Sequence, residues 1–289
     1  MGKEIEIKID SSLHGHRIEY VLEKELKISS SLIKRLKRMP DGIILNGARA
    51  MVIEKVSEGD ILSVNIKGRE TGNIVPANIP IDIIWEDNDI LVLNKAGNIS
   101  IHPSKTHKTD TLANGVIYHT GSREAIHIIT RLDRETSGVV LVAKNPQAAA
   151  ILTEDMKKGK IKKEYIAIVN GVPEVLTGEI DAPIKKKDEK SSLRCVADDG
   201  KRAITLYSVA EKTDKFALVN LYPFTGRTHQ LRVHLSYIGH PIYGDNMYGA
   251  PQTGERVRLH CHKLTFNHPT TGECAVFTGD IPEDFKGII

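Results

Sequence analysis

The chain has 289 residues, of which 40% are hydrophobic and 27% charged, the composition of a globular protein with a sizeable core. A formal net charge of only +3 means that any surface for nucleic acid must be a local basic patch. Three widely spaced cysteines, Cys195, Cys261 and Cys274, argue against a disulfide framework and favour a reducing compartment. The N-terminus is charged and no apolar run reaches membrane-spanning length, so we expect a cytoplasmic protein without membrane contact.

The first 70 residues predict a compact unit of short strands and helices. Residues 4–9 alternate charged and apolar side chains, which predicts a half-exposed strand. Two amphipathic helices follow, the second ending before the turn Pro40-Asp41-Gly42. Residues 43–45 and the Asn-Gly turn after them predict a hairpin. The second helix carries four basic side chains, which indicate either a solvated face or a surface for RNA: Lys34, Arg35, Lys37 and Arg38.

A polar stretch, residues 71–80, has no hydrophobic periodicity and contains two prolines, so we interpret it as a linker. A strand pattern restarts at residue 81. Residues 145–159 predict a helix that begins with Asn-Pro and stops at a glycine. Residues 163–169 predict a strand that contains Tyr165, which on this pattern alone indicates a core aromatic residue.

Residues 128–144, IITRLDRETSGVVLVAK, place a polar centre between two apolar, β-branched runs. This pattern predicts a strand, a tight loop and a second strand. Side chains alternate along a strand, so Arg131 and Asp133 are expected on one face and Leu132 on the other. Taken alone, these residues indicate an ordinary Arg–Asp pair that braces a turn.

A second polar motif, TGRTHQLRVHLSYIGHPIYGDNMYG, spans residues 225–249. It predicts a helix over residues 228–238 with Arg227 at its start, where an arginine by itself indicates a weak surface salt bridge. The run His260-Cys261-His262 suggests a metal site at first. In a strand, however, the cysteine would face away from both histidines, so we interpret the run as structural.

The motif RLDRETSG, together with GRTHQ and the Lys-x-Tyr strand, resembles the RluA-type pseudouridine synthases. The resemblance implies that Asp133 is the catalytic residue in the isomerisation of uridine to pseudouridine within RNA, and that no metal or other cofactor is needed. It implies that Tyr165 faces Asp133 and stacks on the extruded base, and that Arg227 pairs with Asp133. Arg131 would fill the gap left by the base or hold a phosphate.

Residues 11–67 resemble the αL-type RNA-binding domain named after a small-subunit ribosomal protein, whose second helix meets RNA phosphates. The two resemblances predict an α+β protein. An αL-type RNA-binding domain (1–70) and a linker (71–80) would precede a catalytic domain (81–289) with a mixed, largely antiparallel sheet. The chain departs from the catalytic family's pattern at Thr130, where the family has histidine, and at Ala96, where it usually has proline.

Several alternatives stay open at this point. Asp133 would either attack the anomeric carbon of the sugar or remove a ribose proton, and Tyr165 would either stack only or also take the last proton. We expect a monomer that acts on ribosomal RNA, with transfer RNA as the second candidate. A catalytically silent RNA-binding or ribosome-assembly protein on the same fold is the competing interpretation. A metal-dependent nuclease would need a carboxylate cluster that the sequence lacks.

Overall fold

The computed structural model describes residues 3–28, 30–66, 74–104, 106–121, 126–189 and 191–288. The N-terminal part forms a four-stranded sheet in the order β1-β4-β2-β3, in which each neighbouring pair of these described strands is antiparallel. Its elements are β1 (Lys3–Lys8), α1 (Ile18–Tyr20), the π-helical turn η1 (Val21–Glu25), α2 (Ser30–Leu36), β2 (Ile43–Leu45), β3 (Ala48–Arg49) and β4 (Ile61–Ile66). The helices cover one face of this sheet and enclose a core of their own.

Two details of this part differ from the predicted pattern. The first helix changes from α to π geometry at Val21 and ends at Glu25. The second ends at Leu36, so Lys37 and Arg38 lie in the turn that follows it rather than on the helix. The cause is the return of the chain at Gly42, where a Cβ would lie 2.2 Å from the carbonyl oxygen of Leu36. Only glycine allows so close a backbone approach.

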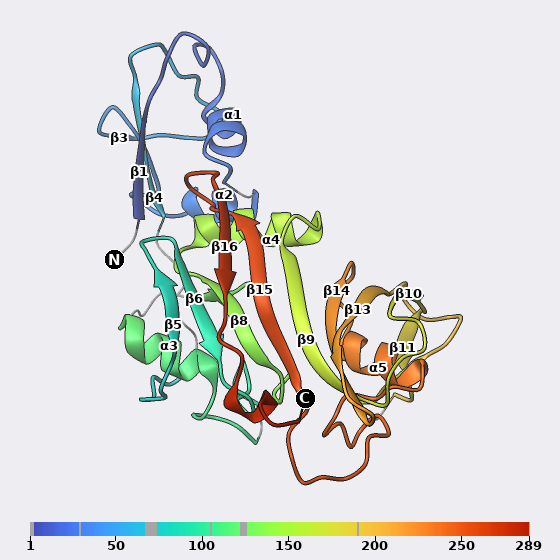
Figure 1. Cartoon of the computed structure of the whole chain (residues 1–289). Helices are drawn as coiled ribbons and strands as arrows, with labels where there is room; N and C mark the ends of the chain where they lie inside the picture. Colours follow the sequence, from blue (N-terminus) through green and yellow to red (C-terminus); the bar gives the residue numbers. More distant parts are fainter. Residues whose placement is uncertain are drawn as a thin grey trace.

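The remaining elements build one ten-stranded sheet (Figure 1). The path runs β10-β13-β14-β9-β15-β8-β6-β5, with β16 beside β15 and β7 beside β8. Among the described strands, β8 and β15 form the one parallel pair, so the predicted mixed and largely antiparallel sheet is confirmed. The strands are β5 (Ile83–Glu86), β6 (Ile90–Lys95), β7 (His127–Ile128), β8 (Ser137–Ala143), β9 (Lys162–Asn170), β10 (Thr177–Asp181), β13 (Ile204–Lys212), β14 (Phe216–Pro223), β15 (Leu259–Asn267) and β16 (Cys274–Thr278); β11 (Ile184–Lys186) and β12 (Arg194–Val196) form a separate hairpin.

The centre of the sheet is buried on both faces, which is why β6 and β8 are almost continuously apolar. Alternate side chains of each strand enter two different cores, as the two-residue period requires. One face, with Leu91 and Val140, packs against α3 (Leu112–Thr120) and α5 (Gln230–Tyr237). The opposite face, with Val92 and Leu141, packs against α4 (Pro146–Lys157). A short 3-10 helix, η2 (Glu283–Phe285), closes the chain.

The helix ends follow the sequence signals closely. Asn145 caps α4, its side-chain oxygen accepting from the backbone N–H of Ala148 at 2.9 Å, and Pro146 is the first helical residue. None of the helices in the described ranges is long and apolar enough to cross a membrane.

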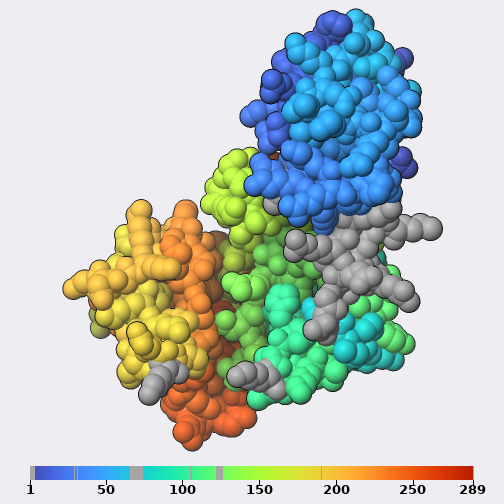
Figure 2. Space-filling view, turned by 180° about the vertical axis from the view of Figure 1, so that it is seen from behind, coloured from blue at the N-terminus to red at the C-terminus, as the bar shows by residue number. Residues whose placement is uncertain are grey.

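The N-terminal part forms a separate lobe that lies next to α4 (Figure 2). Gln147 of α4 donates to the carbonyl of Leu26 at 3.0 Å across this junction. Below the lobe, Figure 2 shows the surface hollowed between the part that contains β10–β14 and the part that contains β6 and α3. The two central strands β9 and β15 connect these parts.

Gly138 marks the point where β8 meets β15. Its φ is +117°, and a Cβ there would lie 2.2 Å from the carbonyl oxygen of Cys261 on the neighbouring strand. The parallel pairing of Gly138 with Cys261 therefore requires a residue without a side chain. This accounts for the glycine of the Thr-Ser-Gly motif.

We expect Gly138→Ala to lower the free energy of unfolding by about 3 kcal/mol or more, because backbone strain and a clash with another strand add. Gly254→Ala is the matched control, since Gly254 also has a positive φ (+72°) but open space around its Cβ position. The control should lose only about 1 kcal/mol. Urea unfolding of both variants measures the difference, and equal losses would contradict the clash.

Candidate active site

Asp133 lies in the loop between β7 and β8, not in a strand as predicted. Strand β7 ends at Ile128, and residues 129–136 have no strand pairing of their own. The predicted alternation still holds in this extended segment. Arg131 is exposed, Leu132 is buried in the core, and the Asp133 side chain keeps 31% of its surface. The loop thus presents the Asp133 carboxylate and the Arg131 guanidinium to solvent, beside the exposed Arg134 and the partly exposed Glu135.

Side chains from distant segments hold this loop in place. The Lys95 ammonium donates to the carbonyl of Arg134 at 3.1 Å, and Arg256 donates to the carbonyl of Glu135 at 3.1 Å. The hydroxyl of Thr130, buried at the position where the related family has histidine, accepts from the backbone N–H of Leu141 at 2.8 Å. These contacts fix the backbone around Asp133, although this segment is not paired with a neighbouring strand.

Lys95 is itself buried and also donates to the carbonyls of Ala96 and Ile99, at 2.8 and 3.0 Å. Burial, with a smaller contribution from repulsion by Arg256, lowers the pKa of Lys95 to about 7, and the attraction of Asp133 opposes this shift. Lys95 therefore ties the turn after β6 to the loop that carries Asp133.

Arg232, the third residue of α5, provides the guanidinium that pairs with Asp133 among the described residues. Its Nη1 lies 3.8 Å from Oδ2 of Asp133, and its Nη2 lies 3.7 Å from Glu135. The side chain is almost fully buried and donates two bonds, of 2.6 and 2.7 Å, to the carboxylate of Asp245, which is fully buried. Although burial opposes its charge, these contacts raise the pKa of Arg232.

The expected pairing of Asp133 with Arg227 is therefore wrong. Arg227 is exposed, and its Nε donates to the backbone carbonyl of Arg202 at 2.9 Å. The helix begins at Gln230, so Arg227 lies in the loop ahead of it. A role for Arg227 in contacting substrate stays a prediction.

The other polar residues of the second motif fix the start of α5. Gln230 accepts from the backbone N–H of Arg227 at 3.0 Å and donates to the carbonyl of Ile204 at 2.9 Å. The buried imidazole of His234 contacts the Thr205 hydroxyl at 2.9 Å. His229 precedes the helix in a left-handed conformation, with its Nε2 4.0 Å from Oδ2 of Asp133.

Tyr165 is 7% exposed and lies in β9 directly opposite Cys261 of β15. Burial raises the pKa of Tyr165 well above 10, and the Cys261 thiol and the Asp133 carboxylate add to the effect. The thiol shares a hydrogen bond with the phenol, and burial raises the pKa of Cys261 to about 12. Burial lowers the pKa of the nearby Lys163. Both the phenol and the thiol are therefore neutral at physiological pH.

The two histidines beside Cys261 are occupied in local contacts. Nδ1 of His260 lies 2.9 Å from the hydroxyl of Ser137, and Nδ1 of His262 lies 3.2 Å from the carbonyl of Gly279. A search of the described residues finds no group of three or more His, Cys, Asp or Glu side chains that could hold a metal ion.

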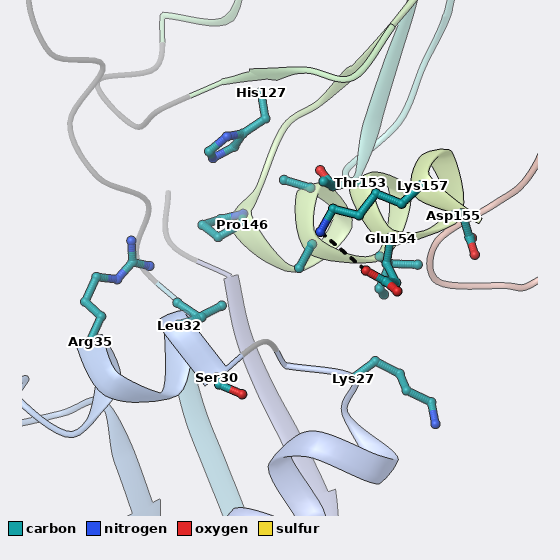
Figure 3. A pocket seen from close by; sticks show the side chains of 13 residues that line it. Lys27, Ser30, Leu32, Arg35, His127, Pro146, Thr153, Glu154, Asp155 and Lys157 are labelled. Carbon is teal, nitrogen blue, oxygen red and sulfur yellow. Dashed lines mark ion pairs between the residues drawn. The ribbon is translucent and has the colours of Figure 1, made fainter. Parts of the chain in front are cut away.

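The basic residues predicted to bind RNA divide into two groups. Lys34, Lys37 and Arg38 are exposed on the N-terminal lobe. Arg35 is half-buried and lines a pocket of about 810 Å³ between this lobe and α4. Figure 3 shows Arg35 on the lobe side of this pocket and His127 on the other side. Asp133 and the residues around it do not line this pocket.

Sequence reasoning missed Arg232, His229 and Lys95 as site residues. The signal for Arg232 was present, because it lies three residues before the buried Leu235 on the same face of a short helix. A charged residue on a buried face needs a partner. The positions of Lys95 and His229 depend on contacts between distant segments, which no local pattern indicates.

Comparison with known proteins bears on this geometry. Residues 89–237 match the model of a family described as RNA pseudouridylate synthase. The chain is 39% identical over 270 residues to YjbO of Bacillus subtilis (strain 168), named an uncharacterized RNA pseudouridine synthase, covering 92% of this chain and 95% of that protein. It is 33% identical to the ribosomal large subunit pseudouridine synthase D of Blochmanniella floridana, covering 95% and 94%. The solved structure of human RNA pseudouridylate synthase domain containing 1 superposes with a TM-score of 0.60 and 29% identity over 71% of this chain and 84% of that one.

The buried ammonium of Lys95 generates a pH-dependent prediction. Its pKa is about 7 in the folded protein and near 10.5 in an unfolded chain, so between these values the unfolded state binds the extra proton. The free energy of unfolding of the wild type should therefore rise with pH, relative to Lys95→Met, by up to about 1.4 kcal/mol per pH unit. Urea unfolding at pH 7, 8 and 9 measures this difference. Parallel pH curves for the two proteins would show that Lys95 stays charged when buried.

Proposed function

The chain belongs to the RNA pseudouridylate synthase family, and we propose that it converts specific uridines of ribosomal RNA to pseudouridine with Asp133 as the catalytic carboxylate. It is thus an RNA pseudouridine synthase. The observation that carries the role of Asp133 is its setting. The carboxylate lies partly exposed on a fixed loop, 3.8 Å from a buried guanidinium and beside a buried tyrosine.

The reaction breaks the bond between the uracil nitrogen and the sugar, turns the base and rejoins it through carbon. Attack on the anomeric carbon and removal of a ribose proton both require an ionised carboxylate. Because Asp245 holds the guanidinium of Arg232 from the other side, Arg232 acts as a positioning residue 3.8 Å from the Asp133 carboxylate. Among the described residues, the Asp133 carboxylate accepts no hydrogen bond, so its oxygens are available to substrate.

The target uridine must leave its stack before a side chain can reach its sugar. Arg131 is exposed beside Asp133, where it can occupy the vacated space or hold a phosphate. Tyr165, which keeps 7% of its surface exposed, is the aromatic residue that we assign to contact with the extruded base. A phenol whose pKa lies well above 10 is almost never ionised at physiological pH, so it cannot serve as a base. Stacking and hydrogen-bond donation are therefore the roles that we assign to Tyr165.

Two observations support ribosomal RNA as the substrate. Relatives that align with this chain over almost its whole length carry the name ribosomal large subunit pseudouridine synthase D. The N-terminal lobe presents three exposed basic side chains, and we propose that residues 1–70 form an RNA-binding domain joined by a linker (71–80) to the catalytic domain (81–289).

Transfer RNA is the second candidate substrate. Mapping pseudouridines in total RNA from cells with and without the gene distinguishes the two.

The competing interpretation is a catalytically silent RNA-binding protein on the same fold. Such a protein would be expected to have lost the aspartate, the tyrosine or the arginine next to them. Asp133, Tyr165 and Arg232 are all present, with Arg232 3.8 Å from the Asp133 carboxylate and Tyr165 within the reach of its charge. We therefore favour catalysis.

Replacing Asp133 with Asn keeps the shape of the side chain and removes its charge. We expect a loss of at least about 100-fold in the single-turnover rate of isomerisation, with folding and RNA affinity nearly unchanged. Glu164→Gln is the matched control, because Glu164 neighbours Tyr165 in the chain but pairs with Lys263 at 2.8 Å. Appreciable turnover by the Asn variant would exclude Asp133 as the catalytic residue.

Replacing Lys34, Lys37 and Arg38 together with Gln should weaken RNA binding and flatten its dependence on salt. Each lost phosphate contact removes about 0.7 to 0.9 from the slope of log K against log salt, so we expect a change of about two to three units. The single-turnover rate at saturating RNA should persist, because the Asp133 site is unchanged.

The control for this prediction removes the same charge from other exposed positions of the lobe, Lys8, Lys24 and Lys55. Binding titrations at several salt concentrations compare the two triple variants. If the control flattens the slope equally, net charge rather than this surface determines binding. If the first variant loses the chemical rate instead, the lobe shapes the active site.

A further inference from the structure

His229, the N-cap residue of α5, has an unusual backbone conformation. Its backbone is left-handed, with φ 57° and ψ 19°, and its side chain makes no capping bond to α5. Non-glycine residues rarely adopt this conformation, and its cost is often accepted at functional sites. Here it turns the imidazole away from the helix and toward Asp133, with only 14% of the side chain exposed.

The hydrogen bonds around His229 fit a neutral imidazole with its proton on Nε2. The Tyr248 hydroxyl accepts from the backbone N–H of Arg194 at 3.0 Å and lies 2.7 Å from Nδ1 of His229. A hydroxyl that donates its own proton to Nδ1 leaves the imidazole proton on Nε2. Burial lowers the pKa of His229, so the ring is neutral near pH 7 and its single proton lies on Nε2.

Nε2 of His229 points at Oδ2 of Asp133 across 4.0 Å, which is too long for a direct hydrogen bond. A hydroxyl oxygen about 2.8 Å from each atom fits between them. Such a hydroxyl would accept from Nε2–H and donate to the carboxylate. Nη1 of Arg232 lies 3.8 Å from the same oxygen, but a guanidinium has no acceptor, so it cannot take the place of the carboxylate.

We propose that His229 and Asp133 together bind the 2′-hydroxyl of the target uridine, which makes His229 a residue that selects ribose over deoxyribose. This inference rests on the proposed function, because a carboxylate that acts at the anomeric carbon or its neighbour lies beside the 2′ position. A 2′-hydroxyl is both donor and acceptor, and proteins distinguish RNA from DNA through it. The pair offers one acceptor and one donor at the matching spacing.

The test is a cycle of two proteins and two substrates. The probe is a ribosomal RNA fragment with a uridine that the wild type modifies, made with ribose or with 2′-deoxyribose at that nucleotide alone. His229→Asn is the variant, because asparagine tolerates a left-handed backbone and retains a polar atom near Tyr248 but does not reach Asp133. Single-turnover rates and equilibrium binding are both measured, and thermal unfolding verifies that the variant is folded.

We expect the Asn variant and the deoxy substitution each to reduce the rate or the affinity by about 10- to 100-fold, the value of a hydrogen bond to a charged group. Combined, they should cost little more than either alone, because both remove the same interaction. His229→Gln, whose amide reaches the position of Nε2, should recover part of the loss on the ribose substrate only. If the Asn variant does not fold, Tyr248→Phe, which releases Nδ1, replaces it in the cycle.

The role of His229 would be overturned if the combined loss equals the product of the two single losses. In that case the Asn variant would reduce the rate or affinity equally on the ribose and the deoxyribose substrate. This result would not affect the proposed function, which the wild-type rate on the ribose substrate measures separately. A wild type that modifies no uridine in ribosomal or transfer RNA would contradict the proposed function itself.

Discussion

The buried ion pair between Arg232 and Asp245 is the constraint on which the site depends. A guanidinium with almost no exposed surface is costly unless its charge and donors are matched, and the fully buried Asp245 takes two of those donors. The arrangement leaves Nη1 directed at Asp133. Because Asp245 holds Arg232 from behind, the guanidinium cannot follow a shift of Asp133, and the start of α5 becomes a fixed reference for the Asp133 carboxylate.

The loop that carries Asp133 is likewise held in place by charged side chains from other segments. An irregular segment between two strands would leave backbone carbonyls without partners, and here the side chains of Lys95 and Arg256 supply the donors. Arg256 is anchored in turn by two bonds to Asp284, near the C-terminus. Segments from both ends of the catalytic part thus meet at one loop, which explains how a non-strand segment can position a carboxylate.

Much of this architecture follows from local pattern. The apolar runs of β6 and β8, the Asn-Pro start of α4 and the hairpin at Asn46-Gly47 were all predictable, because each depends on neighbours in the chain. The choice between two arginines five residues apart was not. It depends on where α5 begins, and the left-handed His229 delays that start to Gln230, which leaves Arg227 in solvent and turns Arg232 inward. The family resemblance identified the motif but not which of its arginines is buried.

The buried tyrosine limits how the proton steps can proceed. Strand β15 covers Tyr165, and the thiol of Cys261 on that strand shares a hydrogen bond with the phenol. Both groups stay neutral because burial disfavours their charged forms. A neutral phenol can donate a bond or support a base, but it accepts a proton only after losing its own. The Asp133 carboxylate, whose charge acts on the phenol, is therefore the acceptor we propose for any proton that leaves the sugar or the base. The fixed guanidinium of Arg232 then stabilises whichever charged form remains.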